Sequence, residues 1–289
     1  MSALRYREVL PPADLRWAVE CFWFAGGPPG GTERIVPDGC PELVVQLGGS
    51  MRAGDEGRQL RTQPRALLVG QRSRALLVSP AGEFRTVAVR LCPASLGRVF
   101  HDDAHRLTDG WGSLEELFGQ EGRTLTAGLE DAADDGERFA VLVAFLRRRL
   151  EGASSRRPVD GAIEALRRAR GRTTVRALCD ETGISERTLE RYFLREVGMS
   201  PRTLAAVLRV QAALLLRDAE PSWARLAAEL EYVDQPHLTR EFRQVAGLPP
   251  GALVGALGPL ARAFVAPDRL RELLGVGSIH DRTPSLRTA

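Results

Sequence analysis

One segment of the sequence is repeated after 49 residues. ISERTLERYFLREVGMSP spans residues 184–201, and VDQPHLTREFRQVAGLPP spans residues 233–250. The two segments keep arginine, phenylalanine, glycine and proline at equivalent positions, namely Arg191 and Arg240, Phe193 and Phe242, Gly198 and Gly247, and Pro201 and Pro250. We therefore expect the same local structure to occur twice, which constrains the fold of this part of the chain more than any other feature.

The first copy has the pattern of two helices joined by a short turn. An amphipathic helix ends at Gly183, and Ser185 is well placed to cap the next helix. Leu189, Phe193 and Val197 recur at the spacing of one helix face and are predicted to point inward.

The second copy repeats this pattern. Asp234 is the predicted cap, and Pro236 fits the first turn, where its missing N–H costs nothing. Leu238, Phe242 and Val245 are the inward residues. Two helices joined by a turn of three or four residues form a helix-turn-helix, so the sequence predicts two such units.

The outward faces of the two second helices carry side chains that can read bases. They are Arg187, Glu190, Arg191 and Arg195 in the first copy, and Gln235, His237, Thr239 and Arg240 in the second. A guanidinium group can bond bidentately to guanine, a carboxylate can accept from cytosine, and an amide suits adenine. Taken without the repeat, the first face is better explained as a solvated helix with ion pairs to Glu186 and Glu190, and the repeat shifts the balance toward base reading.

The segment between the copies supports DNA binding on geometric grounds. Residues 201–218 have a helical apolar period, and a helix of that length spans roughly 27 Å. With its flanking turns, this approaches the ~34 Å between successive major-groove faces of DNA. Residues 158–250 contain 14 arginines and 13 acidic residues. DNA affinity must therefore come from where the arginines lie and not from net charge.

Residues 160–252 resemble the C-terminal DNA-binding domain of the AraC/XylS family of bacterial transcription regulators. The resemblance is carried by SERTLERYF, GMSPRTLAAVLRVQAALLL, WARLAAELEYVDQPHLTREF and GLPPGAL. It implies a cytoplasmic homodimer that binds promoter DNA and recruits or blocks RNA polymerase. The base-contacting positions it implies are Arg187, Glu190 and Arg191, and Gln235, Pro236, Thr239 and Arg240.

Two departures from the family pattern affect the second copy. Glu231-Tyr232 stands where the family has Gly-Phe, and Pro236 occupies a position that is often polar. We therefore expect the second unit to dock differently and to be the weaker reader of bases.

The first part of the chain has a strand pattern. Residues 41–48 are a short apolar run, residues 65–69 and 74–78 repeat the sequence RALLV across a short glycine-containing loop, and residues 83–93 alternate. This pattern predicts a hairpin at 65–78 within an antiparallel barrel or sandwich. RIVPDGCPELVVQLG and VAVRLCPASLGRVF loosely resemble domains found ahead of this DNA-binding unit. That resemblance implies a barrel-like or cupin-like domain that dimerises or senses a small-molecule effector.

The expected architecture is an α+β chain of two domains. A β-rich domain with helices at its end covers residues 1–151, residues 152–158 form a linker, and an all-α domain covers residues 159–257. Two helix-turn-helix units joined by a long helix make up the second domain. Residues 258–289 are expected to be a partly disordered tail with a short helix at 267–274.

Chemistry other than DNA binding has weak support in the sequence. His101 and His105 are four apart but lie in no helical apolar pattern, so we expect an exposed loop and no metal. Residues 30–92 contain no histidine, which argues against a cupin-type enzyme, and no cofactor motif is present. The cysteines are expected to be buried, with a thiol sensor at Cys40 or Cys92 as the alternative.

Some alternatives stay open. Trp17, Trp23 and Trp111 either form aromatic core or line an apolar ligand pocket. The whole chain can also be read as a small-molecule enzyme, or as a protein-interaction module, with an appended helical domain. No apolar run reaches the ~18 residues of a membrane span, and the first residues lack the apolar region of a signal peptide.

Overall fold

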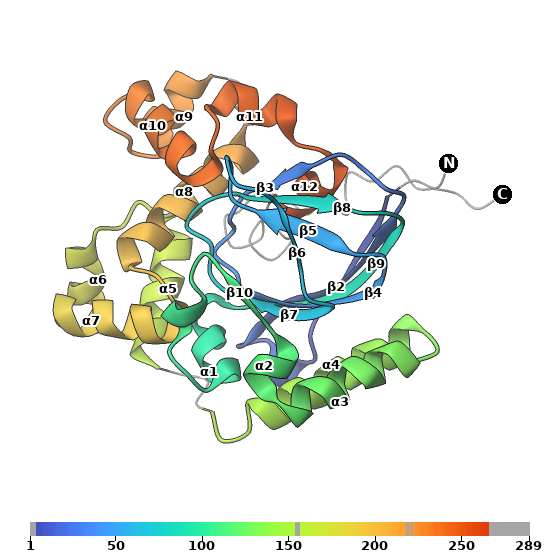
Figure 1. Ribbon diagram of the computed structural model, residues 1–289. Coiled ribbons are helices and arrows are strands. Elements are labelled where there is room, and N and C mark those ends of the chain that lie inside the picture. The colour runs from blue at the N-terminus through green and yellow to red at the C-terminus, as the bar shows by residue number, and fades with distance from the viewer. Residues whose placement is uncertain (1–3, 154–156, 218–219, 221, 266–289) are drawn as a thin grey trace.

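The structure is a computed structural model that describes residues 4–153, 157–217, 220 and 222–265. Two antiparallel sheets from the first part of the chain lie beside a group of helices from the second part (Figure 1). The six-stranded sheet has the order β1 (Arg5–Val9), β2 (Val19–Gly27), β9 (Phe84–Leu91), β4 (Glu42–Gly48), β7 (Ala66–Val69) and β10 (Trp111–Ser113). The four-stranded sheet has the order β3 (Glu33–Ile35), β8 (Leu76–Pro80), β5 (Met51–Gly54) and β6 (Arg61–Thr62).

These strands form a sandwich and not a closed barrel, because no strand pairing among the described residues joins the two sheets. Strand β9 shows how the two faces of the larger sheet are used. Val87, Val89 and Leu91 belong to one apolar cluster, and Phe84 and Ala88 belong to another that lies between the sheets. The predicted alternation along residues 83–93 is confirmed, with both faces of the strand buried.

The predicted hairpin at residues 65–78 is wrong. β7 pairs with β4 and β10, whereas β8 pairs with β3 and β5 in the other sheet. The segment between β7 and β8 does not form a hairpin turn, because it is bound to the loop before β10. Gly70 passes so close to the carbonyl of Leu107 that a side chain would not fit, and Ser73 is hydrogen-bonded through its N and Oγ to Asp109 at 2.8 and 2.6 Å.

Helices cover the outer face of the larger sheet. They are α1 (Leu96–Phe100), α2 (Leu114–Phe118), α3 (Gln120–Asp131) and α4 (Asp135–Arg149), and α2–α4 lie below the sheets in Figure 1. α2 begins with a reciprocal cap, which the spacing of Ser113 and Glu116 in the sequence predicts: Ser113 accepts from the N–H of Glu116, and the Glu116 side chain accepts from that of Ser113. Asp134 caps α4 by accepting from the N–H of Glu137, and the Glu137 side chain accepts from the N–H of Ala133.

The second part of the chain is helical. Its elements are α5 (Pro158–Arg168), α6 (Val175–Thr182), α7 (Glu186–Tyr192), a π-helical turn η4 (Phe193–Val197), α8 (Pro201–Leu216), α9 (Trp223–Glu229), α10 (Gln235–Ala246), α11 (Pro250–Ala256) and α12 (Pro259–Phe264). One apolar cluster holds α5–α11 together around α8, whose Leu204, Val207 and Leu208 are fully buried. The predicted pair of helix-turn-helix units joined by a long helix is confirmed.

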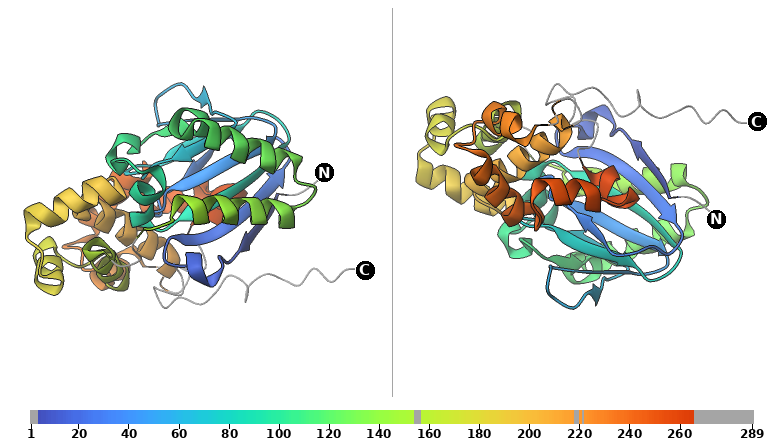
Figure 2. Two further views of the ribbon diagram at one scale, coloured as in Figure 1. Left: turned by 90° about the horizontal axis from the view of Figure 1, so that it is seen from below. Right: turned by 90° about the horizontal axis from the view of Figure 1, so that it is seen from above.

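The two parts share buried contacts. Val36, from the segment after β3, belongs to the helical cluster, and Gln211 of α8 donates to the carbonyls of Val36 and Pro37 at 3.4 and 2.6 Å. Arg167 of α5 forms a buried ion pair with Glu20 at 2.6 Å. α8 therefore contacts both the recognition helices and the sandwich (Figure 2).

Helix α12 was not anticipated by the sequence. It returns to the sandwich, where Leu260 and Phe264 join the cluster between the sheets. The backbone N–H of Ala261 donates to Glu33 of β3 at 2.8 Å, which holds the start of the helix there. The helix expected at residues 267–274 lies outside the described residues. No helix among those described is long and apolar enough to cross a membrane.

Candidate nucleic-acid interface

The first helix-turn-helix is built as the sequence predicts. α6 ends at Gly183, whose φ of 68° is the left-handed conformation that glycine adopts without strain. The Oγ of Ser185 accepts from the N–H of Thr188 and caps α7. Leu189 and Phe193 are fully buried, which fixes the rotation of α7 and turns the opposite face to solvent.

The outward residues of this unit divide into two groups. Arg187 and Arg191 are exposed on α7, with Glu190 half-buried beside them, and the Arg191 guanidinium lies 5.7 Å from the ring centre of Tyr192. Arg195 is exposed too, but it lies in η4 and is paired with its neighbour Glu196 at 3.1 Å. The bond from the N–H of Gly198 to the carbonyl of Phe193 is of the i→i+5 kind. Arg195 remains close to Arg191, since the guanidinium groups of both lie over the Tyr192 ring, at 5.8 and 5.7 Å from its centre.

The reason for the π turn lies in the sandwich domain. η4 packs against α1 and the turns on either side of it, and Gly97 lies so close to the carbonyl of Arg195 that a side chain would not fit. Thr108 donates its hydroxyl hydrogen to the carbonyl of Gly198. Glu196 is buried and pairs with Arg157 at 3.1 Å. The end of the first recognition helix is thus bound to the N-terminal domain.

The second helix-turn-helix differs in its turn. α9 ends at Glu229 and α10 begins at Gln235, so the turn is longer than the three residues between α6 and α7. Glu231 has a φ of 59°, a conformation that costs a residue with a side chain about 1–2 kcal/mol. Asp234 accepts from the N–H of His237 at 2.6 Å and is the predicted cap.

Tyr232 explains the departure from the family pattern. Its ring is buried and its hydroxyl donates to Glu241 of α10 at 2.6 Å, while Arg209 of α8 donates to the same carboxylate. Burial and the neighbouring Glu241 carboxylate raise the pKa of Tyr232, so the hydroxyl remains a donor. Tyr232 therefore connects α10 to α8 through a polar triad with Glu241 and Arg209.

The predicted base-contacting residues of α10 are not equally available. Gln235, Pro236 and Arg240 are exposed, and Arg240 lies 4.0 Å from Asp234. Thr239 is half-buried. His237 is also half-buried, and its ring packs edge-on against Tyr232 at 5.3 Å. The surface that this helix offers is consequently centred on Gln235, Pro236 and Arg240.

Two apolar side chains beside the recognition helices were missed by the sequence reasoning. Val233 is 88% exposed in the turn before α10, and Leu194 is 46% exposed after α7. An apolar side chain in this place can contact the methyl group of thymine. The signal for Val233 was available, because it directly precedes the predicted cap Asp234.

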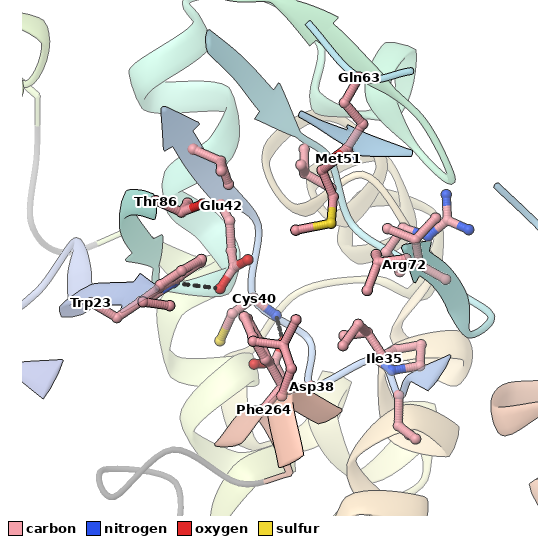
Figure 3. Close-up of a pocket in the computed structure, with 18 of the residues that line it drawn as sticks. Trp23, Ile35, Asp38, Cys40, Glu42, Met51, Gln63, Arg72, Thr86 and Phe264 are labelled. Atoms are coloured by element: carbon pink, nitrogen blue, oxygen red, sulfur yellow. Dashed lines mark hydrogen bonds between the residues drawn. The ribbon is translucent and has the colours of Figure 1, made fainter. Parts of the chain in front are cut away.

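A second candidate site lies in the sandwich. A cavity of about 110 Å³ between the sheets is lined by Trp23, Asp38, Glu42, Met51, Phe84 and Phe264 among others (Figure 3). Burial raises the pKa of Glu42 to about 7 against the opposing effect of Arg90. Sequence reasoning singled out none of the charged residues here, because they come from separate strands.

Two of the tryptophans have different surroundings, and the cysteines differ in burial. Trp23 lines this cavity and is also core, whereas Trp17 lies 5.3 Å from the Arg98 guanidinium. All four cysteines are free, with Cys21 and Cys92 buried and Cys40 and Cys179 partly exposed. Burial raises the pKa of the Cys40 thiol well above its usual range, which disfavours the thiolate that a sensor needs.

The two histidines considered as metal ligands, His101 and His105, lie in different local structures. His101 ends α1 with a left-handed backbone, and its Nε2 lies 2.7 Å from the carbonyl of Arg149. His105 is exposed in the 3-10 turn η3 (Ala104–Leu107). In the described parts of the chain, no group of three or more histidine, cysteine, aspartate or glutamate residues could hold a metal ion.

Similarity to solved structures is broad in coverage and low in identity. ToxT from Vibrio cholerae is 10% identical with a TM-score of 0.45, over 82% of this chain and 98% of that one. Wild-type ToxT from Vibrio cholerae strain SCE256 with bound unsaturated fatty acid is 11% identical with a TM-score of 0.41, over 89% and 95%. The AraC-like transcriptional activator CuxR is 12% identical with a TM-score of 0.27, over 66% and 79%.

Family models match both parts of the chain, although no curated protein matches the sequence. Residues 7–111 match a family described as a domain of unknown function, DUF6597. Residues 178–255 match a family described as a helix-turn-helix domain, and this range contains α7, α8 and α10. The C-terminal part of this chain is therefore a helix-turn-helix domain of the AraC/XylS type.

Proposed function

We propose that this protein is a transcription regulator that reads two consecutive major-groove segments of promoter DNA in the cytoplasm. Residues 159–257 would bind the DNA, and residues 1–151 would dimerise and hold a small-molecule effector. The observation that carries the proposal is the exposure of Arg191 and Arg240 at equivalent positions of α7 and α10, each on a capped helix whose opposite face is buried.

The length of α8 supports two reading helices in one chain. Its 16 residues span roughly 23 Å, and the turns on either side add to the separation of α7 and α10. The required distance between neighbouring major-groove segments is ~34 Å. α7 is paired with the start of α8 through Glu186 and Arg202. α10 is paired with the middle of α8 through Glu241 and Arg209. Both helices lie to the left of the sheets in Figure 1, and the last turn of α10 also contacts the sandwich, where Arg34 donates to the carbonyl of Ala246.

The exposed residues favour base reading over phosphate binding. Arg191 and Arg240 offer forked donors to guanine, and Gln235 offers an amide to adenine. Arg187 has no ion pair within the described residues and is available to either a base or a phosphate. Arg195, paired with Glu196 in η4, is better placed for a phosphate than for a base.

The proposal is tested by selecting bound duplexes from random DNA with the full-length protein near physiological salt. Two enriched blocks with centres about ten base pairs apart are expected. Arg191→Ala should erase preference in one block and Arg240→Ala in the other. Arg123→Ala, which removes an exposed arginine of α3, is the control for charge and should leave both blocks intact.

Other outcomes separate the alternatives. One block that depends on Arg191 alone would mean that α10 does not read bases. No enrichment, with binding lost as salt rises, would overturn sequence-specific reading and favour a protein-interaction module. Dimerisation and contact with RNA polymerase follow from the family resemblance, and sedimentation of the protein on a selected duplex would test the first of them.

A further inference from the structure

The cavity between the sheets has an unusual balance of charge at one end. Arg90 is fully buried and is paired with three carboxylates: Glu42 at 3.0 Å, Asp38 at 3.2 Å and Glu8 at 3.4 Å. The charged residues that line the cavity in the described part of the chain are Asp38, Glu42 and Arg72. The charge of Arg72 is neutralised by Asp55 at 2.6 Å. One guanidinium thus faces three carboxylates at the closed end of an apolar space.

This balance favours a positive ligand. A buried charge that lacks a partner is costly, and the opposite charge of a ligand lowers that cost. A carboxylate ligand would instead bring a fourth negative group to Arg90. Burial raises the pKa values of both Glu42 and Asp38 although Arg90 lowers them, so the cost of removing these carboxyl groups from water exceeds the attraction of the one cation.

Glu42 is placed to receive such a ligand. Its two hydrogen bonds, from the Trp23 indole and from Arg90, both end on Oε1 at 3.0 Å. Figure 3 shows the Glu42 carboxyl group reaching into the ring of lining side chains, while the Arg72 guanidinium points away from it. Oε2 is therefore the acceptor that faces the cavity.

The remaining walls suit an apolar body next to a cation. Trp23, Phe84 and Phe264 are aromatic, and the faces of such rings attract cations as well as apolar groups. The Arg90 guanidinium already lies over the Phe264 ring, 4.9 Å from its centre, so we assign the ligand to Trp23 and Phe84. Met51 and Val78 complete the apolar surface. The cavity of about 110 Å³ is close to the ~150 Å³ that holds one benzene molecule in an engineered protein core. A body of about one ring therefore fits while α12 stays in place.

We propose that this cavity binds a small organic cation, a protonated amine on an apolar body of about one ring, with its ammonium group on Glu42 and Asp38. The proposal deepens the proposed function, on which its regulatory part rests, because this ligand would be the effector of the DNA-binding domain.

One segment that lines the cavity also contacts the DNA-binding domain. The segment 36–40 lines the cavity and also contacts α8: Gly39 packs against Leu204, and the carbonyls of Val36 and Pro37 accept from Gln211. A ligand that moves Asp38 therefore displaces a segment on which α8 rests. α8 is paired with both recognition helices, with α7 through Arg202 and with α10 through Arg209.

The binding site is tested by calorimetry on the full-length protein without DNA. The probes are benzylamine, benzyl alcohol and benzoate, which share one ring and differ in charge. Benzylamine should bind at least about tenfold more tightly than benzoate, a difference of about 1.4 kcal/mol. Affinity for benzylamine should rise between pH 6 and pH 8, because the amine requires Glu42 in its ionised form.

Variants distinguish the site from general attraction. Glu42→Gln keeps the shape and the acceptor for Trp23, and should weaken benzylamine about tenfold while changing benzyl alcohol less than about twofold. Glu115→Gln, which removes an exposed carboxylate of α2, should change neither. Each of three results would overturn the proposal: benzoate binds as tightly as benzylamine, no probe binds, or the Glu42→Gln variant keeps the parent protein's affinity for benzylamine.

A separate arm keeps this inference apart from the proposed function. Affinity for a selected duplex is measured with and without saturating benzylamine. A changed affinity supports the effector role, and an unchanged affinity with intact amine binding overturns that role but not the site. If no sequence-specific DNA binding exists, the calorimetric result still decides the cation site.

Discussion

The guanidinium group of Arg98 donates from Nη2 to both carboxylate oxygens of Asp160, at 2.9 and 2.8 Å. This contact joins α1 of the sandwich domain to α5 of the helical domain. The same Nη2 lies 3.5 Å from Glu196 in η4, and the Arg98 side chain is only 1% exposed. One buried cation of the sandwich domain thus contacts both α5 and the end of the first recognition helix.

Removing this cation should destabilise the protein strongly. Arg98→Ala leaves Asp160 and Glu196 without a shared partner, and breaking a buried pair costs ~3–5 kcal/mol. We expect about 3 kcal/mol, since Asp160 retains partial contact with water. Urea unfolding measures the loss. Arg106→Ala, which removes the exposed pair with Asp102, is the matched control and should cost less than ~1 kcal/mol. Equal small losses would show that the domain contact is not stabilising.

The arginines of the first recognition helix should not be equivalent. Arg191→Ala is expected to cost ~1–3 kcal/mol at a selected DNA site and to relax preference at one base pair. Arg195→Ala should weaken all duplexes alike and by less, because this side chain lies in the π turn η4 and is paired with Glu196. Fluorescence anisotropy on matched and single-mismatch duplexes distinguishes the two. Base-specific loss from Arg195→Ala would contradict the assignment.

Glycine at position 231 should stabilise the second helix-turn-helix. Glu231 adopts a φ of 59°, which costs ~1–2 kcal/mol with a side chain, whereas glycine loses ~0.5–1 kcal/mol more entropy on folding. The exposed pair with Arg172 is worth little. Glu231→Gly should therefore raise the free energy of unfolding by about 0.5 kcal/mol. Ala228→Gly, at an exposed position inside α9, should lower it by ~1 kcal/mol. Destabilisation by both would refute the strain.

The free energy of unfolding of the protein should fall as the pH rises through the pKa of Glu42. Burial raises the pKa of Glu42 from 4.5 to about 7, despite Arg90 and the Trp23 donor, and the neighbouring Asp38 carboxylate adds to the rise. A raised carboxyl pKa means that the folded state binds the proton more tightly than the unfolded state. The resulting stability is complete below pH 4.5 and is lost as the pH approaches and passes 7.

The measurement for this effect is urea unfolding between pH 5 and pH 8. Glu42→Gln should flatten the decline over this range and be more stable than the parent protein at pH 8. A parent protein whose stability rises from pH 5 to pH 8 as steeply as the variant's would disprove a raised Glu42 pKa. Benzylamine should oppose the decline in the parent protein and have no such effect in the variant.

The sequence by itself determined the local elements of the helical domain. Ser185 and Asp234 cap the helices that they were predicted to cap, and Ser113 with Glu116 forms its reciprocal cap. Caps and helix periods depend on residues within a few positions of one another, so one-dimensional patterns identify them. The same locality makes the repeat, and with it the outward positions of Arg191 and Arg240, recognisable from the order of residues alone.

Tertiary structure alone decided how these elements meet. The two RALLV strands enter different sheets, and the loop at Leu107–Asp109 binds their connection. The first recognition helix is attached to the sandwich because η4 packs on Gly97. The carboxylates around Arg90 come from separate segments and gather only when the strands pair. Contacts between distant residues have no short-range signal, since each depends on burial that the whole fold creates.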